Sequence, residues 1–428
     1  MPENSTTILL KSRTSGTSMQ GPHDPLRILH VVEHWRPCTT GYATRSWELV
    51  TAQARTEGLC PAVLVSSRQS IRGDKPVEVS EMLDGRLERI SPSVRERWLR
   101  PFRANTLDSE HHQTAIQETA RNHDADVIHV HWSSGLGLAA VRAAESFGCP
   151  VVAEVRFDLA GVVMTETVRM SIPFLEPGLR RYFERHLPRA DAVVAASHSL
   201  ADLIDSTFPD LGSPTVVPNA VDHSLFTPTS QVPTLRQKLG LQEGFVVGTT
   251  SNMLRYEGLG HLLAATRRLR DEGIDARALF VGDGPRQDAL EQRADRHDIP
   301  TVFTGRVPFE EVPQHLCAMD AFAVPRRDVT ATRFASPIKI VEAMACGRPV
   351  VASQVGDIPA LLAEDRGLLV PPDDVPALTD ALCSLASAPK RRAALGERAC
   401  SFAKRECAWS TVAQRCARVY QSVLRSVD

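Results

Sequence analysis

A lysine and a glutamate three positions apart, Lys339 and Glu342, are the side chains of this sequence best placed to bind a charged ligand. The expected helix that carries them begins at Ser336-Pro337, since proline suits a first turn, and ends at Gly347. Residues three apart lie on the same face of a helix. The spacing alone is equally compatible with an ion pair on a surface helix.

Two arginines, Arg326 and Arg327, follow an apolar run shortly before this helix. The amino-terminal end of a helix attracts anions, and these guanidinium groups together with Lys339 strengthen that attraction. The carboxylate of Glu342 can accept hydrogen bonds from the hydroxyl groups of a ribose. The combination predicts a site for a nucleoside diphosphate.

Three other patterns indicate chemistry more weakly. His129 and His131 are two apart in an apolar run, so they share one face of a strand. They are either two metal ligands without an evident third or ordinary core residues. Asp124-Ala125-Asp126 spells the D-x-D metal motif, but it precedes a strand like an ordinary turn. Gly282-Asp283-Gly284 lacks the last glycine of the dinucleotide fingerprint, so it argues only weakly for NAD.

Short β-branched runs alternate with amphipathic helical patterns along the chain. Continuous apolar runs fit strands buried on both faces of a parallel sheet, and their alternation with helices predicts an α/β protein. The runs form two series. The first comprises residues 27–33, 61–67, 127–131, 150–155 and 192–197, and the second comprises 245–250, 277–282, 301–305, 321–325 and 349–353.

Two series of strands predict two facing, doubly wound, Rossmann-like domains with a ligand cleft at the carboxyl ends of their strands. Proline and asparagine interrupt the pattern at 217–222. We therefore expect a flexible polar tail over 1–24, one domain over 25–216, a second over 217–405 and a final helix over 406–428.

Composition excludes several classes of protein. The 428 residues include 49 Lys and Arg against 51 Asp and Glu, a formal charge of −2, which gives no electrostatic footprint for nucleic acid. No apolar run approaches the roughly 18 residues of a membrane span, and the first residues do not resemble a secretory signal. The nine cysteines are spread out without metal-ligand spacing. Because no secretory signal is evident, we expect a reducing, cytoplasmic location in which such thiols are mostly buried.

The stretch around Lys339 resembles the nucleotide-sugar motif of family 4 of the GT-B glycosyltransferases, in the variant S-P-x-K-x-x-E-A-M-A-x-G-x-P-V-V-A-S. The resemblance covers about residues 27–405 and implies a GT-B fold. It implies that the first domain binds acceptor, the second binds a nucleotide sugar, and the last helix packs back on the first. Four further segments match family motifs in the family's order: Asp126–His131, Pro218–Asp222, Phe280–Pro285 and Gly367–Asp374.

The resemblance also implies roles for single residues. Glu342 matches the second glutamate of the family's E-x7-E motif, Lys339 a basic residue of the variant, and His131 a histidine near the reacting centre. These three are the expected catalytic residues. The expected donor-binding residues are Gly41, Asn252, Arg255, Gly282, Arg326, Arg327, Ser336, Lys339 and Glu342. The expected acceptor-side residues are Tyr42, Arg45, Trp132, Glu154 and Arg156.

Three positions depart from the family pattern. Phe334 replaces the first glutamate of E-x7-E, and Asn252 and Glu257 replace the usual phosphate-binding arginine and lysine. A glutamate at 257 should repel the donor phosphates. Because the surrounding segments resemble a bacterial polysaccharide-associated subgroup, our hypothesis is that Arg326, Arg327 and Lys339 neutralise the phosphates instead.

The implied reaction is retaining transfer of a sugar from a UDP- or GDP-sugar to a hydroxyl of a glycan, a lipid-linked sugar or a small metabolite. No metal or other cofactor is implied. The alternatives are an epimerase of nucleotide sugars with the same fold and a non-catalytic subunit that binds sugar nucleotides. The segment Arg180–Phe183 is either a peripheral contact with the inner face of a membrane or a solvated helix face.

Overall fold

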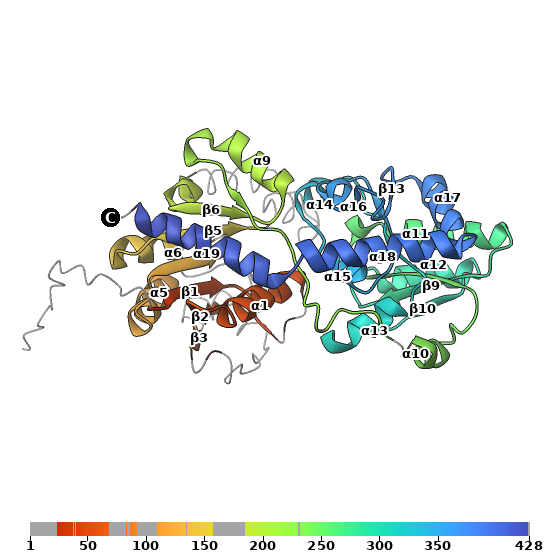
Figure 1. Cartoon of the computed structure of the whole chain (residues 1–428), viewed down its shortest axis with the longest axis horizontal. Coiled ribbons are helices and arrows are strands. Elements are labelled where there is room, and N and C mark those ends of the chain that lie inside the picture. The colour runs from red at the N-terminus through yellow and green to blue at the C-terminus, as the bar shows by residue number, and fades with distance from the viewer. Residues whose placement is uncertain are drawn as a thin grey trace, which may run out of the picture.

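Two α/β domains lie side by side in the computed structural model of the chain (Figure 1). The structure describes residues 24–36, 38, 40–67, 83, 86–91, 109–133, 135–156, 185–229 and 232–426. The expected polar tail up to residue 23 and the segment Arg180–Phe183 lie outside the described residues.

The first domain contains a parallel sheet of seven strands in the order β3-β2-β1-β4-β5-β6-β7. Most of its strand residues are buried, as continuous apolar strands between two helical layers should be. The strands are β1 (Leu26–Val32), β2 (Leu59–Val65), β3 (Leu87–Arg89), β4 (Val127–His131), β5 (Val151–Val155), β6 (Ala192–Ala195) and β7 (Thr215–Val216). The helices are α1 (Gly41–Ala54), α5 (Ser109–Asn122), α6 (Leu136–Phe147) and α9 (His198–Thr207), with short 3-10 turns η2 (Leu187–Arg189) and η3 (Pro209–Leu211).

The second domain contains a parallel sheet of six strands in the order β10-β9-β8-β11-β12-β13. The strands are β8 (Phe245–Thr250), β9 (Ala276–Val281), β10 (Thr301–Phe303), β11 (Ala321–Val324), β12 (Val350–Ser353) and β13 (Leu368–Val370). The helices are α10 (Val232–Lys238), α11 (Leu259–Asp271), α12 (Gln287–Arg296), α13 (Val312–Cys317), α14 (Thr330–Phe334), α15 (Ile338–Ala345), α16 (Ile358–Leu362), α17 (Val375–Ala386) and α18 (Pro389–Glu406), with 3-10 turns η4 (Arg255–Glu257) and η5 (Phe309–Glu311).

The expected α/β class with two Rossmann-like domains is confirmed, and all ten expected strands form within about two residues of their predicted bounds. The prediction missed β3, β7 and β13. These strands are two or three residues long and only partly buried, so they carry no sustained apolar run.

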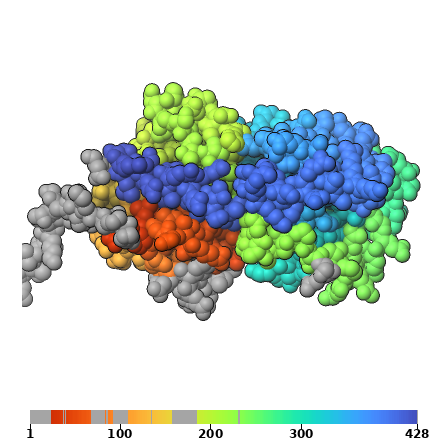
Figure 2. Space-filling model, viewed as in Figure 1, coloured from red at the N-terminus to blue at the C-terminus, as the bar shows by residue number. Residues whose placement is uncertain are grey.

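The last two helices join the domains. α18 packs on α15 and α17 of the second domain, whereas α19 (Trp409–Arg425) packs on α1 of the first. In the space-filling view they form a continuous blue band across both domains (Figure 2). α19 buries one apolar face there, including Trp409, Val412 and Val419. No helix among the described residues is long and apolar enough to cross a membrane.

Candidate functional site

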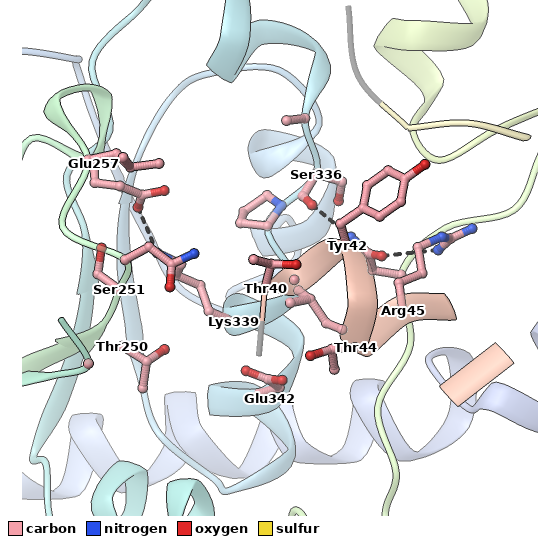
Figure 3. A pocket seen from close by; sticks show the side chains of 18 of the residues that line it. Thr40, Tyr42, Thr44, Arg45, Thr250, Ser251, Glu257, Ser336, Lys339 and Glu342 are labelled. Carbon is pink, nitrogen blue, oxygen red and sulfur yellow. Dashed lines mark hydrogen bonds and ion pairs between the residues drawn. The ribbon is translucent and has the colours of Figure 1, made fainter. Parts of the chain in front are cut away.

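A cavity of about 560 Å³ lies between the two domains. Segments that follow the strands of both sheets line it: residues 33–34 follow β1, residue 156 follows β5, residues 250–252 end and follow β8, and residues 281–283 end and follow β9. The amino-terminal ends of α1 and α15 approach it from opposite domains (Figure 3). The site therefore lies where parallel sheets commonly bind ligands.

The cavity brings together ten of the residues singled out from the sequence. From the donor set these are Gly41, Asn252, Gly282, Arg326, Ser336, Lys339 and Glu342, and from the acceptor set they are Tyr42, Arg45 and Arg156. Arg255, Arg327, His131, Trp132 and Glu154 do not line it.

Glu257 holds the two cations of the second domain in place. Its carboxylate accepts a hydrogen bond from Arg326 Nη2 at 3.0 Å. It accepts another from Lys339 Nζ at 2.7 Å, and Glu257 and Lys339 are both labelled in Figure 3. Burial alone would raise the pKa of Glu257, but the charges and hydrogen bonds of Arg326 and Lys339 lower it to about 2. Glu257 is therefore the counterion of a cluster whose net charge is +1, and the two cations offset the repulsion of an anion that its charge alone would cause.

Lys339 keeps donors free for a ligand, and one donor of Arg326 is buried without a partner among the described residues. Arg326 Nε is buried and has no hydrogen-bond partner among the described residues. The Lys339 ammonium has three N–H groups, of which Glu257 takes one. Burial lowers the pKa of Lys339, with Glu257 opposing that shift. An anion in the cavity would satisfy the remaining donors of Lys339.

The loop that carries Glu257 is fixed by a close backbone approach. Gly258 has φ +67°, and a Cβ there would lie 1.9 Å from the carbonyl oxygen of Pro325, just before Arg326. Only glycine tolerates both the conformation and the contact. The segments that supply Glu257 and Arg326 are therefore packed directly against each other.

Glu342, on the next turn of α15 after Lys339, is a buried carboxylate that forms no ion pair with the described residues. Burial raises its pKa to about 7, Lys339 lowers it, and Glu48 of α1 raises it further. Burial also raises the pKa of Glu48 to about 7, with Arg36 opposing. Two carboxylates in opposite domains thus titrate near neutrality, and hydroxyl donors at Glu342 would favour its charged form.

Arg255 and Arg327 are corrections to the expected donor set. Arg327 Nε donates to Asp373 Oδ1 at 3.0 Å, and both arginines line a separate depression. Arg326 and Arg327 are consecutive residues after β11, so their side chains leave the extended chain in opposite directions. Only Arg326 reaches the cavity.

A second buried carboxylate, Glu154 at the end of β5, organises the first domain's wall. It accepts hydrogen bonds from Arg45 Nε at 2.6 Å and Arg156 Nε at 2.9 Å. Burial would raise the pKa of Glu154, but Arg156 and Arg45 hold it well below its usual range. Glu154 therefore positions the two arginines of this wall from behind and does not contact the acceptor directly.

The two arginines of this wall are occupied by the protein itself. The other nitrogens of Arg45 donate to Val217 O, Pro218 O and Asn219 Oδ1 at 2.7 to 3.0 Å. Arg156 donates to Tyr42 O, to Ser46 Oγ and to His131 Nδ1 as well as to Glu154. At the cavity wall, these two guanidinium groups therefore contribute positive charge and shape, and few unused hydrogen-bond donors.

His131 lies in a buried cluster behind Arg156, which differs from the expected contact with a donor sugar. Arg156 Nη2 is 2.6 Å from His131 Nδ1, and because guanidinium can only donate, that nitrogen must be the acceptor. His131 Nε2 then donates to His30 Nδ1 at 3.0 Å. The His131 ring is fully enclosed, and its backbone oxygen accepts from the Tyr42 hydroxyl.

The same reasoning assigns the donor and the acceptor of each hydrogen bond that leads from His30 to the C-terminal helix α19. His30 Nε2 donates to Gln53 Oε1 at 2.8 Å, and Gln53 Nε2 donates to the Tyr420 oxygen at 3.0 Å. The Tyr420 hydroxyl donates to His129 Nδ1 at 2.5 Å, which leaves the His129 proton on Nε2, 3.1 Å from Glu154 Oε2. One directed chain of hydrogen bonds thus runs from Arg156 through α19 to His129, whose Nε2 lies close to the Glu154 carboxylate.

His30 is a third histidine that the sequence did not reveal next to His129 and His131. Their ring nitrogens lie within 4.8 Å of one another, close enough for a shared metal ion. A metal on His131 Nε2 would put a proton on Nδ1, facing the donating Arg156. Burial lowers the pKa of all three histidines, that of His30 to about 3. We therefore assign the cluster to hydrogen bonding between neutral rings.

Other expectations about single residues are also corrected. Trp132 is buried against Gly137, where a Cβ would lie 2.5 Å from the indole, so it packs in the core. Asp124 and Asp126 both pair with Arg27 at a surface turn, which accounts for the D-x-D pattern without a metal. Phe334 packs on the first domain's core and is not in the cavity lining.

Hydrogen bonds connect the two walls. Asn219 Nδ2 donates to Ser336 O at 2.7 Å, and Ser197 Oγ donates to Phe334 O at 2.9 Å. The carboxylate of Asp357 accepts from the backbone N–H groups at 198 and 199, at the start of α9. The position of α15 is therefore set by the first domain as well as by its own.

Several cavity residues were not singled out from the sequence. Glu48 lies behind the cavity lining and belongs to no sequence motif. The one indication of its role in the sequence was its position in the middle of an otherwise buried face of α1. The other missed residues include Glu33, His34, Thr44, Thr250, Ser251 and Tyr256. Their common signal is that they follow strands or begin helices at the cleft.

Comparisons with known proteins identify relatives of both domains. The sequence profile described as glycosyltransferase family 4 matches residues 71–225, and the profile described as glycosyl transferases group 1 matches residues 244–388. A GDP-mannose-dependent monoacylated alpha-(1-6)-phosphatidylinositol monomannoside mannosyltransferase of Corynebacterium glutamicum is 27% identical over 333 residues, which cover 76% of this chain and 83% of that protein. A 2-deoxystreptamine glucosyltransferase of Streptomyces kanamyceticus is 30% identical over 258 residues, 57% of this chain and 64% of that protein.

Solved structures share the whole architecture. A sucrose-phosphate synthase from Thermosynechococcus elongatus superposes with a TM-score of 0.75 at 20% identity, covering 94% of this chain and 100% of that one. The Anabaena protein HepE in complex with UDP-glucose gives a TM-score of 0.67 at 21% identity, covering 93% and 100%. At these identities the comparison establishes the GT-B fold.

Replacing Glu257 by glutamine tests the cation cluster. Without the carboxylate, Arg326 and Lys339 would be two buried neighbouring charges with no counterion, so we expect the free energy of unfolding to fall by about 3–5 kcal/mol in urea titrations. A second change, Lys339→Met, should recover part of the loss. Glu397→Gln, on the exposed face of α18, is the matched control. Equal stability of Glu257→Gln and the parent chain would contradict the assignment.

Replacing Tyr420 by phenylalanine tests the buried hydrogen-bond chain. The change leaves Gln53 Nε2 without its acceptor and His129 Nδ1 without its donor, at an expected cost of about 1–3 kcal/mol. In a double-mutant cycle with Gln53→Leu we expect a coupling energy above about 0.5 kcal/mol. Additive effects of the two changes would show that the chain is not a connected network.

Proposed function

The chain belongs to family 4 of the glycosyltransferases, and from this membership we propose that it transfers a sugar from a nucleoside diphosphate sugar to a hydroxyl group with retention of anomeric configuration. The observation that carries the proposal is the arrangement on and beside α15: Arg326 and Lys339, fixed by Glu257, lie next to Glu342 in the cavity wall. This is a site for two phosphates followed by a ribose.

The proposed chemistry needs a stabilised leaving group. As the bond between the sugar and the diphosphate breaks, negative charge develops on the phosphate oxygens. Arg326 and Lys339 are already oriented by Glu257, so they stabilise that charge without reorganising. Glu342 accepts hydrogen bonds from the ribose and thereby fixes the nucleotide along the second domain.

The acceptor is proposed to enter along the first domain's wall. Since Arg45 and Arg156 are occupied by protein partners, recognition of its hydroxyl groups falls to Tyr42, Thr44 and the polar residues after β1. The net positive charge behind this wall also suits an acceptor that carries phosphate or carboxylate.

The relatives suggest candidate donors. The corynebacterial relative is named as GDP-mannose-dependent, and the structural neighbour HepE has been solved with UDP-glucose. We propose a GDP-sugar or a UDP-sugar as donor.

A panel of UDP-, GDP-, dTDP- and ADP-sugars tests donor binding by thermal unfolding. A donor present at 100 times its dissociation constant should stabilise the chain by about 2.7 kcal/mol. The shift should be selective for one base and should vanish in Glu342→Ala but persist in Glu397→Ala. No shift with any nucleotide sugar would contradict the proposal.

The pH dependence of donor affinity tests the role of Glu342. Its pKa in the free protein is about 7, and ribose hydroxyls prefer the ionised carboxylate, so binding should release a proton. We expect affinity to fall by up to about tenfold per unit as pH decreases below 7, and to level off above it. Isothermal titration of the parent chain with the donor, at pH values from about 5.5 to about 8.5, measures this pH dependence of the affinity.

Two variants serve as controls for that titration. Glu342→Gln should bind more weakly and independently of pH. Glu48→Gln removes the neighbouring charge that raises the pKa of Glu342, so the transition should move to lower pH. A flat profile in the parent chain would show that the carboxylate does not receive the ribose.

A further inference from the structure

A second depression, of about 260 Å³, lies on the second domain outside the donor cavity, and the two share only Leu254 in their linings. Four arginines from three segments converge on it. Arg255 comes from η4, Arg286 and Arg293 from the start and body of α12, and Arg327 from the segment after β11. His261 of α11 completes its lining of ionisable side chains.

The positive charge of this depression is largely uncompensated. Asp373 is the one carboxylate paired with it among the described residues, at 3.0 Å from Arg327 Nε and 3.7 Å from His261 Nε2. The side chains of Arg255, Arg286 and Arg293 have no hydrogen bond or ion pair with the described residues. Like charges that converge on one hollow repel one another unless an anion enters.

We propose that this depression is a second anion site, which binds a phosphate group. Planar guanidinium groups donate pairs of parallel hydrogen bonds to phosphate oxygens, and several of them around one hollow suit a doubly charged anion better than a carboxylate. The volume is less than half that of the donor cavity, which fits a phosphate or diphosphate group rather than a whole nucleotide sugar.

The glycine at 260 contributes to this geometry. A Cβ there would lie 3.0 Å from Arg293 Nη1, so that guanidinium rests directly over the backbone of the first turn of α11. The site lies back to back with the donor cavity: Arg255 faces one side and Glu257 the other, and Arg327 N donates to Tyr256 O at 2.9 Å between them. Phosphate binding here requires no nucleotide sugar, so it is independent of the proposed reaction.

Isothermal titration with inorganic pyrophosphate tests the site in the full chain. The measurement is made in Lys339→Met, which weakens the donor cavity, and again after adding Arg286→Gln and Arg293→Gln. Losing two charged hydrogen-bonding groups should weaken pyrophosphate binding by about tenfold or more. The matched control adds Arg268→Gln and Arg391→Gln, two exposed arginines elsewhere on this domain, and should bind like Lys339→Met alone.

Two results would overturn the proposal: no pyrophosphate binding in Lys339→Met, or the same affinity with and without Arg286 and Arg293. Gly260→Ala gives an independent check, because it displaces Arg293 without removing a charge and should also weaken binding.

Vesicles distinguish the source of the phosphate. Co-sedimentation with phosphatidic acid vesicles, but not phosphatidylcholine vesicles, that is lost in Arg286→Gln/Arg293→Gln supports the site and assigns it to a lipid headgroup. Pyrophosphate binding without such co-sedimentation supports the site and assigns it to a free phosphate.

Discussion

The cavity depends on one buried carboxylate in each domain. Glu154 lies between Arg45 and Arg156, and Glu257 lies between Arg326 and Lys339. Two neighbouring cations cannot be buried without a counterion, and a lone buried carboxylate would be equally unstable. Within each group the carboxylate is neutralised by its two cations, and the group carries a net charge of +1. The two walls of the cleft are therefore built by the same electrostatic constraint.

The two groups differ in what they leave for a ligand. In the first domain, the arginines donate their hydrogen bonds to residues 217–219 of the linker between the domains, to α1 and to the histidine cluster. The group around Glu154 therefore connects the cavity wall to that linker and to α19. In the second domain, the Lys339 ammonium retains unused donors at the cavity, and Arg326 Nε is buried without a partner among the described residues. The asymmetry supports a diphosphate on the second domain and an acceptor on the first.

The sequence predicted the fold well because parallel strands buried on both faces leave continuous apolar runs. It also predicted Lys339, Glu342 and Arg326 at the cavity, because one helix and one strand end place them. The prediction was incomplete where a partner is distant in sequence. The negative charge of Glu257 suggested repulsion of phosphates, and only the structure shows that Lys339, 82 positions later, pairs with it. The predicted donor contact of Arg327 was wrong because neighbouring residues of an extended chain point in opposite directions. The predicted sugar contact of His131 was wrong because the sheet face that it shares with His129 points into a buried cluster.

The most direct test of this account is a crystal structure of the chain with the nucleoside diphosphate whose base the thermal panel selects. The account predicts phosphate oxygens within hydrogen-bond distance of Arg326 and Lys339, with the ribose hydroxyls on Glu342. Phosphates bound away from both cations, with the Glu257 cluster unchanged, would contradict it.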